Sequence, residues 1–183
     1  MIRLPSWRKR SALQLRQVGR QKFPRTCFET SSVSGNSFGA YKYVAVIGVD
    51  GGGSFFQNTS TPNIDSIFAN GATTYNCYTP VSISAQSWGS MLHGVTADYH
   101  KLTNSSIASN RYPTNSDYPS IFRVIREAKP SAALASVVGW SEINYGIVEE
   151  GFDVTKLQDN STDDSIVRDQ ACNYPIIRMV GYM

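Results

Sequence analysis

The chain has 183 residues, which is enough for one domain with a substantial core and too few for two. No apolar run approaches the roughly 18 residues of a membrane helix, so we expect no membrane span. The three cysteines lie far apart without a CxxC pair, which indicates neither a disulfide framework nor a zinc knuckle. A reducing compartment, the cytoplasm, is therefore expected.

The positive charge is concentrated at the start of the chain. Residues 1–25 contain eight of the 17 Lys and Arg residues and no acid, which leaves nine basic and 14 acidic side chains for the rest. Residues 1–40 lack the apolar stretch of a secretory signal, and they also resemble organelle presequences and nucleic-acid-binding arms in composition. Their low hydrophobicity and terminal position predict a disordered leader and linker, followed by one acidic domain over residues 41–183. No nucleic-acid partner is expected for this domain.

The first expected elements surround a run of glycines. Residues 43–50 (YVAVIGVD) are β-branched and continuously apolar, which predicts a central parallel strand covered on both faces. Residues 60–72 have the pattern of a helix, with Thr61 as N-cap and Gly71 as C-cap. Residues 73–79 (TTYNCYT) favour a strand by propensity.

Helices and strands are also expected to alternate in the second half of the domain. Residues 84–94 (SAQSWGSMLHG) predict a short helix closed by Gly94, and residues 118–130 predict another helix. Residues 131–140 (SAALASVVGW) predict a buried strand, and residues 163–174 predict an acid-led helix. Strands and helices in alternation indicate an α/β fold with a mostly parallel sheet flanked by helices.

Asp50 raises the question of what binds at the end of the first strand. A carboxylate in that place must be solvated, paired or bound to a cation. The three glycines that follow do not form a dinucleotide fingerprint, because Phe56 stands where the last glycine would be, and no Walker A sequence follows. One nucleotide alternative stays open, since GVDGGG resembles the first phosphate loop of the actin-like sugar kinases. That loop should lead into a second strand, whereas a helix is expected here.

The order of motifs over about residues 43–105 resembles the alkaline phosphatase superfamily. The resemblance is carried by Asp50 and the glycine after it, then TPNIDSIFANGATTYNCYTP, then SISAQSWGSMLHGV. In the sulfatase and nucleotide pyrophosphatase/phosphodiesterase branches, a nucleophile precedes a glycine by ten residues, and counting back from Gly94 gives Ser84. The sulfatase signature CxPSR is absent, because Gln86 and Trp88 replace its Pro and Arg. Phosphate chemistry is therefore favoured over sulfate chemistry.

The resemblance implies a metal-dependent hydrolase of phosphate mono- or diesters that acts on a small phosphoester substrate. It gives Ser84 the role of catalytic nucleophile, makes Asp50 and Ser84 metal ligands, and gives Asn104 contact with the phosphoryl group; an ordinary loop position is an equal alternative for Asn104. The resemblance also implies a site for two divalent ions, zinc in the complete enzyme. Physical chemistry agrees, since ligands of open α/β sheets lie beyond the carboxyl ends of strands and helix N-termini favour anions.

Other ligands of the family's two-metal site are missing from this sequence. Its two histidines, His93 and His100, are expected to pack or hydrogen-bond rather than bind metal, and no Asp-His pair occurs. The chain is therefore interpreted as the N-terminal part of a hydrolase domain, at best a trace catalyst, with its last strand left as an exposed edge. The acidic pair Glu149 and Glu150 is expected to be solvated. The alternative from another class is a non-catalytic α/β binding or interaction fragment; no oligomeric state is predicted.

Overall fold

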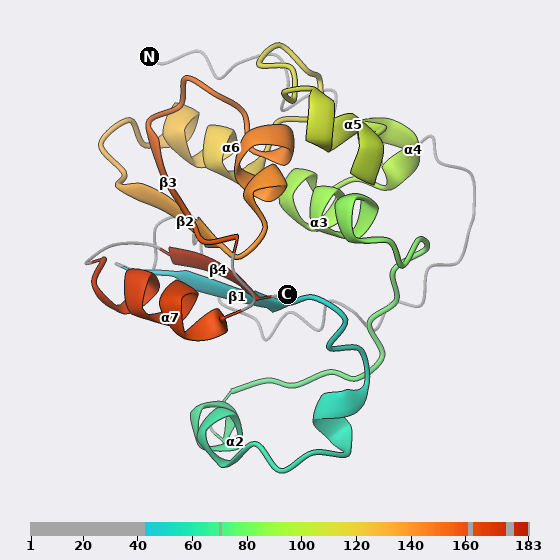
Figure 1. Cartoon of the computed structure of the whole chain (residues 1–183), viewed down its shortest axis with the longest axis vertical. Coiled ribbons are helices and arrows are strands. Elements are labelled where there is room, and N and C mark those ends of the chain that lie inside the picture. The colour runs from blue at the N-terminus through green and yellow to red at the C-terminus, as the bar shows by residue number, and fades with distance from the viewer. Residues whose placement is uncertain (1–42, 70, 161–162, 175–177, 183) are drawn as a thin grey trace, which may run out of the picture.

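The computed structural model describes residues 43–69, 71–160, 163–174 and 178–182 (Figure 1). The leader predicted over residues 1–40 lies outside the described residues. The described chain folds as α/β, with one four-stranded parallel sheet of order β1-β4-β2-β3. The strands are β1 (Ala45–Val49), β2 (Leu134–Val138), β3 (Val154–Gln158) and β4 (Arg178–Tyr182). The helices are η1 (Phe55–Gln57), α2 (Pro62–Phe68), α3 (Ser84–His93), α4 (Ala97–His100), α5 (Asn104–Ser109), α6 (Ile121–Ala128), η2 (Ile143–Ile147) and α7 (Asp164–Cys172).

Strand β2 is the centre of the core and is buried along its whole length, as its continuously apolar sequence predicts. Its residues alternate between the two faces of the sheet. Leu134 and Val138 join the larger apolar cluster, which includes residues of α3, α6 and η2. Val137 joins a smaller cluster with Val167 and Ala171 of α7, which lies on the opposite side of the sheet (Figure 1). The sheet is therefore covered by helices on both faces around β2.

Helix α3 begins and ends where the sequence predicts. Ser84 is its first residue, and Gly94 follows its last residue in the left-handed conformation, with φ of 66°. The backbone N–H of Gly94 donates to the carbonyl of Ser90, which closes the last turn. A residue with a Cβ would be strained at that φ, so the glycine is what ends the helix cleanly.

The prediction that the first strand is central and covered is wrong. Strand β1 lies at one edge of the described sheet, and its side chains are mostly exposed, including Ile47 at 64%. The reason is that the neighbours of β1 are few: β4 pairs with it on one side, and the chain after Asp50 leaves the sheet instead of covering it (Figure 1).

The segment after β1 forms a separate lobe that carries η1 and α2 (Figure 1). Thr61 is the N-cap of α2 as predicted, but the C-cap is Ala69 rather than Gly71. Residues 73–79 form no strand, because no neighbouring strand pairs with them. The glycines after Asp50 lead into η1 and α2, and not into the second strand that a sugar-kinase loop requires.

Three elements near the end of the chain were not predicted. Helix η2 is a π-helix, and β3 extends the sheet beyond β2. Strand β4 pairs with β1 on one side and β2 on the other, so the prediction that the last strand is an edge is wrong. Among the described residues, no helix has the length and apolar character needed to cross a membrane.

Candidate functional site

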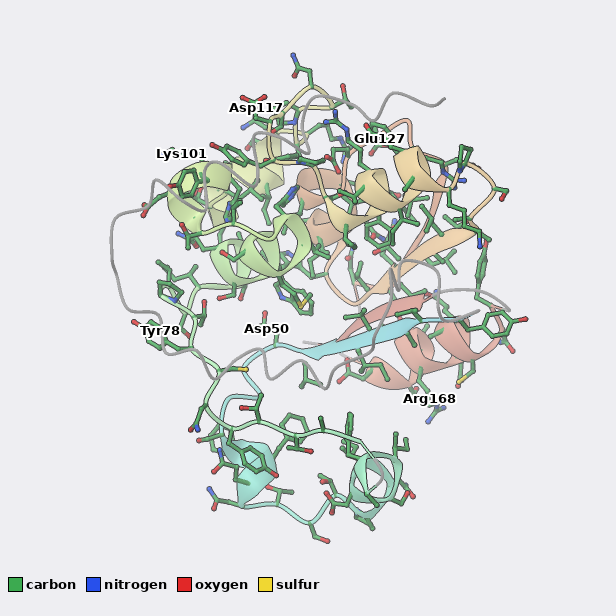
Figure 2. All side chains as sticks on the ribbon, turned by 180° about the vertical axis from the view of Figure 1, so that it is seen from behind. Asp50, Tyr78, Lys101, Asp117, Glu127 and Arg168 are labelled. Atoms are coloured by element: carbon green, nitrogen blue, oxygen red, sulfur yellow. The ribbon has the colours of Figure 1, made fainter. Side chains whose placement is uncertain are left out.

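Asp50 follows the last residue of β1, at the carboxyl edge of the sheet (Figure 2). Its Oδ2 accepts a hydrogen bond from the indole Nε1–H of Trp88, at 3.4 Å. Trp88 is buried in α3, and its ring lies so close to Gly48 that any Cβ at position 48 would overlap it. The sequence Gly48-Val49-Asp50 therefore lets the indole pack beneath the strand and reach the carboxylate.

Ser84 stands at the start of α3, four residues before Trp88. Positions four apart lie on one face of a helix, so Ser84 shares the face of α3 that Trp88 turns toward Asp50. The residue that caps the helix is Ile83, which leaves the half-buried Ser84 hydroxyl out of the capping interaction. The described hydrogen bonds connect Asp50 to α3 through Trp88, and none joins Asp50 directly to Ser84.

Asn104 lies beside the same end of α3. Its side-chain Oδ1 accepts from the backbone N–H of Ala85, at 3.0 Å. Asn104 is itself the first residue of α5, whose N-cap Thr103 exchanges hydrogen bonds with Ser106 in a capping box. With its oxygen bound to Ala85, the amide of Asn104 keeps its Nδ2 group free to donate to an anion near Ser84.

The two histidines pack and hydrogen-bond, as predicted. The ring nitrogens of His93 lie 2.9 Å from the carbonyl oxygen of Tyr118 and 3.2 Å from that of Ile147. His100 accepts the backbone N–H of Leu102 at Nδ1, so its Nε2 carries the proton and donates toward α3. Burial lowers the pKa of both histidines, and the negative charge of Glu149 opposes this effect at His93.

The prediction for the acidic pair is wrong at one of its two positions. Glu149 is only 1% exposed, and its Oε1 accepts the backbone N–H of Ser120 at 3.0 Å. Glu150 is exposed and forms an ion pair with Lys156 at 3.0 Å. The two acids differ because the buried segment of residues 146–149 ends at Glu149, and Glu150 is the first exposed residue after it.

The described residues offer few side chains that could bind a metal ion. In residues 43–69, 71–160, 163–174 and 178–182, no group of three or more His, Cys, Asp or Glu side chains is arranged to hold an ion. Asp50 and Ser84 offer one carboxylate and one hydroxyl, whereas a catalytic zinc ion usually has about three protein ligands. The described residues therefore do not fit a complete two-metal site.

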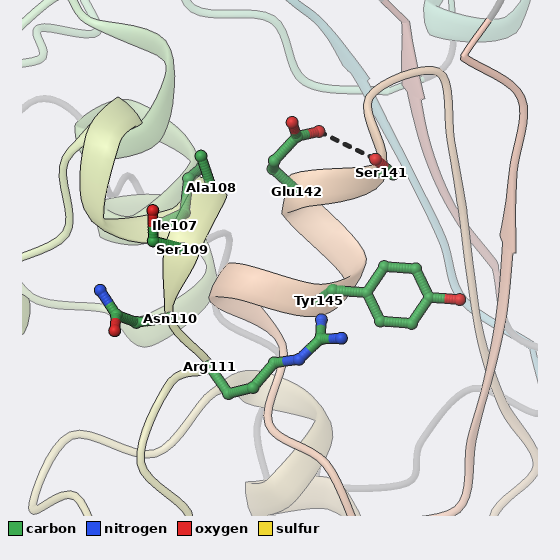
Figure 3. Close-up of a pocket in the computed structure, with 8 residues that line it drawn as sticks. All are labelled: Ile107, Ala108, Ser109, Asn110, Arg111, Ser141, Glu142 and Tyr145. Atoms are coloured by element: carbon green, nitrogen blue, oxygen red, sulfur yellow. Dashed lines mark hydrogen bonds between the residues drawn. The ribbon is translucent and has the colours of Figure 1, made fainter.

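A polar hollow of about 260 Å³ lies between the end of α5 and the start of η2 (Figure 3). Eight residues line it: Ile107, Ala108, Ser109, Asn110, Arg111, Ser141, Glu142 and Tyr145. Several of them follow the carboxyl end of β2, at the edge of the sheet where ligands of α/β proteins bind. Sequence reasoning missed this hollow, because its residues come from two segments without a shared motif.

Sequence reasoning also gave Trp88 no positive role. The sequence contains a glycine at position 48 and a large aromatic residue at position 88, but their contact becomes visible only when β1 and α3 are placed together.

Comparison of the chain with protein-family models, curated proteins and solved structures finds no match. The described structure establishes an α/β fold with a small parallel sheet. It establishes no role for Asp50, Ser84 or Asn104.

Proposed function

We propose that this chain is a metal-dependent hydrolase of phosphate mono- or diesters, with Ser84 as its nucleophile. One observation carries the proposal: Asp50 and Asn104 come from distant parts of the chain, and both hydrogen-bond to the helix that Ser84 begins. The three residues are those that the resemblance to the alkaline phosphatase superfamily singles out.

In this proposal the Oγ of Ser84 attacks phosphorus, an Oγ–P bond forms, and the bond to the leaving alcohol breaks. Water then hydrolyses the phosphoserine and returns the free hydroxyl. The backbone N–H groups at the start of α3 and the Nδ2 group of Asn104 would stabilise the negative phosphoryl oxygens. Asp50 is the residue that would hold a divalent ion, and such an ion would supply positive charge to the site.

A second candidate is a non-catalytic α/β binding or interaction fragment. The specific observation in its favour is the incomplete donor set, because one carboxylate and one hydroxyl hold zinc weakly. We therefore expect this polypeptide to bind zinc weakly and to turn over substrate slowly.

The test measures hydrolysis of a nitrophenyl phosphate monoester and diester in the presence of added zinc. We expect a low, zinc-dependent rate that is lost in Ser84→Ala, because the hydroxyl of the neighbouring Ser87 is engaged by the carbonyl of Val81 at 2.9 Å. Asp50→Asn should lose rate and zinc binding together, since an amide is a poorer ligand than a carboxylate. The matched control is Ser82→Ala, which removes an exposed hydroxyl two residues away.

Two results would contradict the proposal. Equal rates in Ser84→Ala and the unchanged protein would move the nucleophile elsewhere. A folded protein with neither zinc binding nor turnover would favour the binding fragment.

A further inference from the structure

The hollow between α5 and η2 contains side chains of both charges that are not paired with each other. Arg111 and Glu142 both line it (Figure 3), yet neither belongs to an ion pair among the described residues. Opposite charges that share a polar hollow without meeting favour a ligand that carries both charges.

Arg111 is positioned by Tyr145. Its guanidinium carbon lies 4.6 Å from the centre of the tyrosine ring, a cation–π contact that holds the side chain beside η2. Lys156 lies 5.5 Å from the same ring, but its ammonium is engaged by the carbonyl of Val148 and by the carboxylate of Glu150. Arg111 is therefore the cation that is available to an anionic ligand, and its planar donors suit a carboxylate.

Glu142 is fixed at the other side of the hollow. Its Oε2 accepts from the hydroxyl of Ser141 at 2.9 Å, and the backbone N–H of Ser141 donates to Oδ1 of Asn160 at 3.1 Å. Figure 3 shows the Glu142 carboxylate directed away from the end of Arg111 that lies beside Tyr145. The second oxygen of the carboxylate can accept from an ammonium group.

The size and the backbone of the hollow also suit a small ligand. A volume of about 260 Å³ leaves room for a small organic molecule. One wall is the π-helix η2, and π-helical turns occur frequently at functional sites.

We propose that this hollow binds a small zwitterion of the ω-amino acid class, with its carboxylate on Arg111 and its ammonium on Glu142. The two protein charges do not meet, so the ligand must place several bonds between its own two charges. This binding site is argued from its own residues and does not depend on the proposed hydrolase activity.

The test is calorimetric titration of the whole chain with glycine, β-alanine and γ-aminobutyrate, together with butyrate and butylamine, which carry one charge each. We expect one of the longer ω-amino acids to bind best and both single-charge compounds to bind at least about tenfold more weakly, because each loses one charge-assisted contact. Arg111→Gln and Glu142→Gln should each weaken binding by a similar factor. Arg168→Gln is the matched control, since it removes an exposed arginine on α7, far from the hollow in sequence and on another element.

The proposal is overturned if no ω-amino acid binds at millimolar concentration to the folded protein. It is also overturned if butyrate or butylamine binds as tightly as the best zwitterion, or if either variant binds as the unchanged protein does. Circular dichroism of each variant establishes that it is folded, and both substituted side chains lie at the surface of the hollow rather than in the core.

Discussion

His93 is enclosed by groups that accept rather than donate hydrogen bonds. Both ring nitrogens face carbonyl oxygens, and the ring lies 4.1 Å from that of Tyr112. Desolvation is the largest effect and lowers the pKa of His93 below its usual value of 6.5, while the carbonyl partners and the charge of Glu149 act in the opposite direction. Desolvation also lowers the pKa of His100, with a smaller contribution from the positive charge that His93 would carry.

We expect the protein to lose stability when the pH falls below about 6.5. The folded histidines have lowered pKa values, so at such a pH the unfolded histidines hold more protons than the folded ones. The contribution to stability is fully present above the unfolded pKa and is lost as the pH falls toward the lowered folded pKa. Each histidine can add a slope of up to about 1.4 kcal/mol per pH unit to the free energy of unfolding.

Urea unfolding between about pH 7.5 and pH 5 measures this slope. His100→Gln should reduce the slope, because the amide does not titrate, and His93→Gln should reduce it as well. A slope that is unchanged in both variants would assign the acid sensitivity to other groups.

The structure also explains the identity of Gly48. A Cβ at this position would overlap the ring of Trp88, which is the residue that connects Asp50 to α3. We expect Gly48→Ala to lower the free energy of unfolding by about 1–3 kcal/mol, the usual cost of overpacking. Ala45→Val is the control in the same strand, since Ala45 is exposed and its substitution adds volume without that overlap. Urea unfolding of both variants compares them, and equal losses would mean that Trp88 moves aside at little cost.

At the scale of elements, two strands with similar sequences have opposite environments. AVIGV in β1 and LASVV in β2 are both apolar and β-branched, but β1 is mostly exposed and β2 is buried throughout. Composition predicts that both are strands and does not predict their burial, because burial depends on which segments return to cover them.

The same substitution in the two strands should therefore have different effects. Val137→Ala removes a fully buried side chain between β2 and α7, and we expect it to cost about 2 kcal/mol in the free energy of unfolding. Val46→Ala removes a side chain that is 44% exposed, and it should cost well under half as much. Comparable losses in urea unfolding would show that β1 is covered in solution.

The sequence predicted helices α2, α3, α6 and α7, whereas η1, α4, α5 and η2 were missed. Ser120 and Asp163 cap α6 and α7 through their side chains, and Gly94 ends α3, so local chemistry marks these boundaries. Strand β3 (VTKLQ) was missed because it mixes polar and apolar residues and is stabilised by pairing with a distant strand. Residues 73–79 have strand propensity but no strand beside them, so propensity alone gave a wrong result.

The sequence predicted some parts of the candidate site and missed others. The order of motifs pointed to Asp50, Ser84 and Asn104, and the structure brings Asp50 and Asn104 to the helix that Ser84 begins. The contact through Trp88 and the hollow at Arg111 depend on tertiary packing. No periodicity in the sequence marks such contacts.

At the scale of the whole molecule, apolar exposure is concentrated in the first described segment. Val46, Ile47 and Val49 of β1 are exposed, as are Ile67 and Phe68 of α2, among other large side chains. Residues 43–49 carry no charge, and β1 is an edge of the described sheet. A neutral apolar edge strand is a ready partner for another strand.

We expect the protein to self-associate through β1 as its concentration rises, because two neutral copies of this strand can pair without repulsion between charges. Ile47→Lys should reduce the association, since pairing would bring two ammonium groups together at an apolar edge, while an exposed position tolerates the charge in the folded monomer. Ile166→Lys is the matched control on α7, where the isoleucine is 41% exposed and belongs to no edge strand. Sedimentation velocity over a range of concentrations measures the association. A monomer at every concentration, or equal effects of the two substitutions, would show that β1 is not the contact.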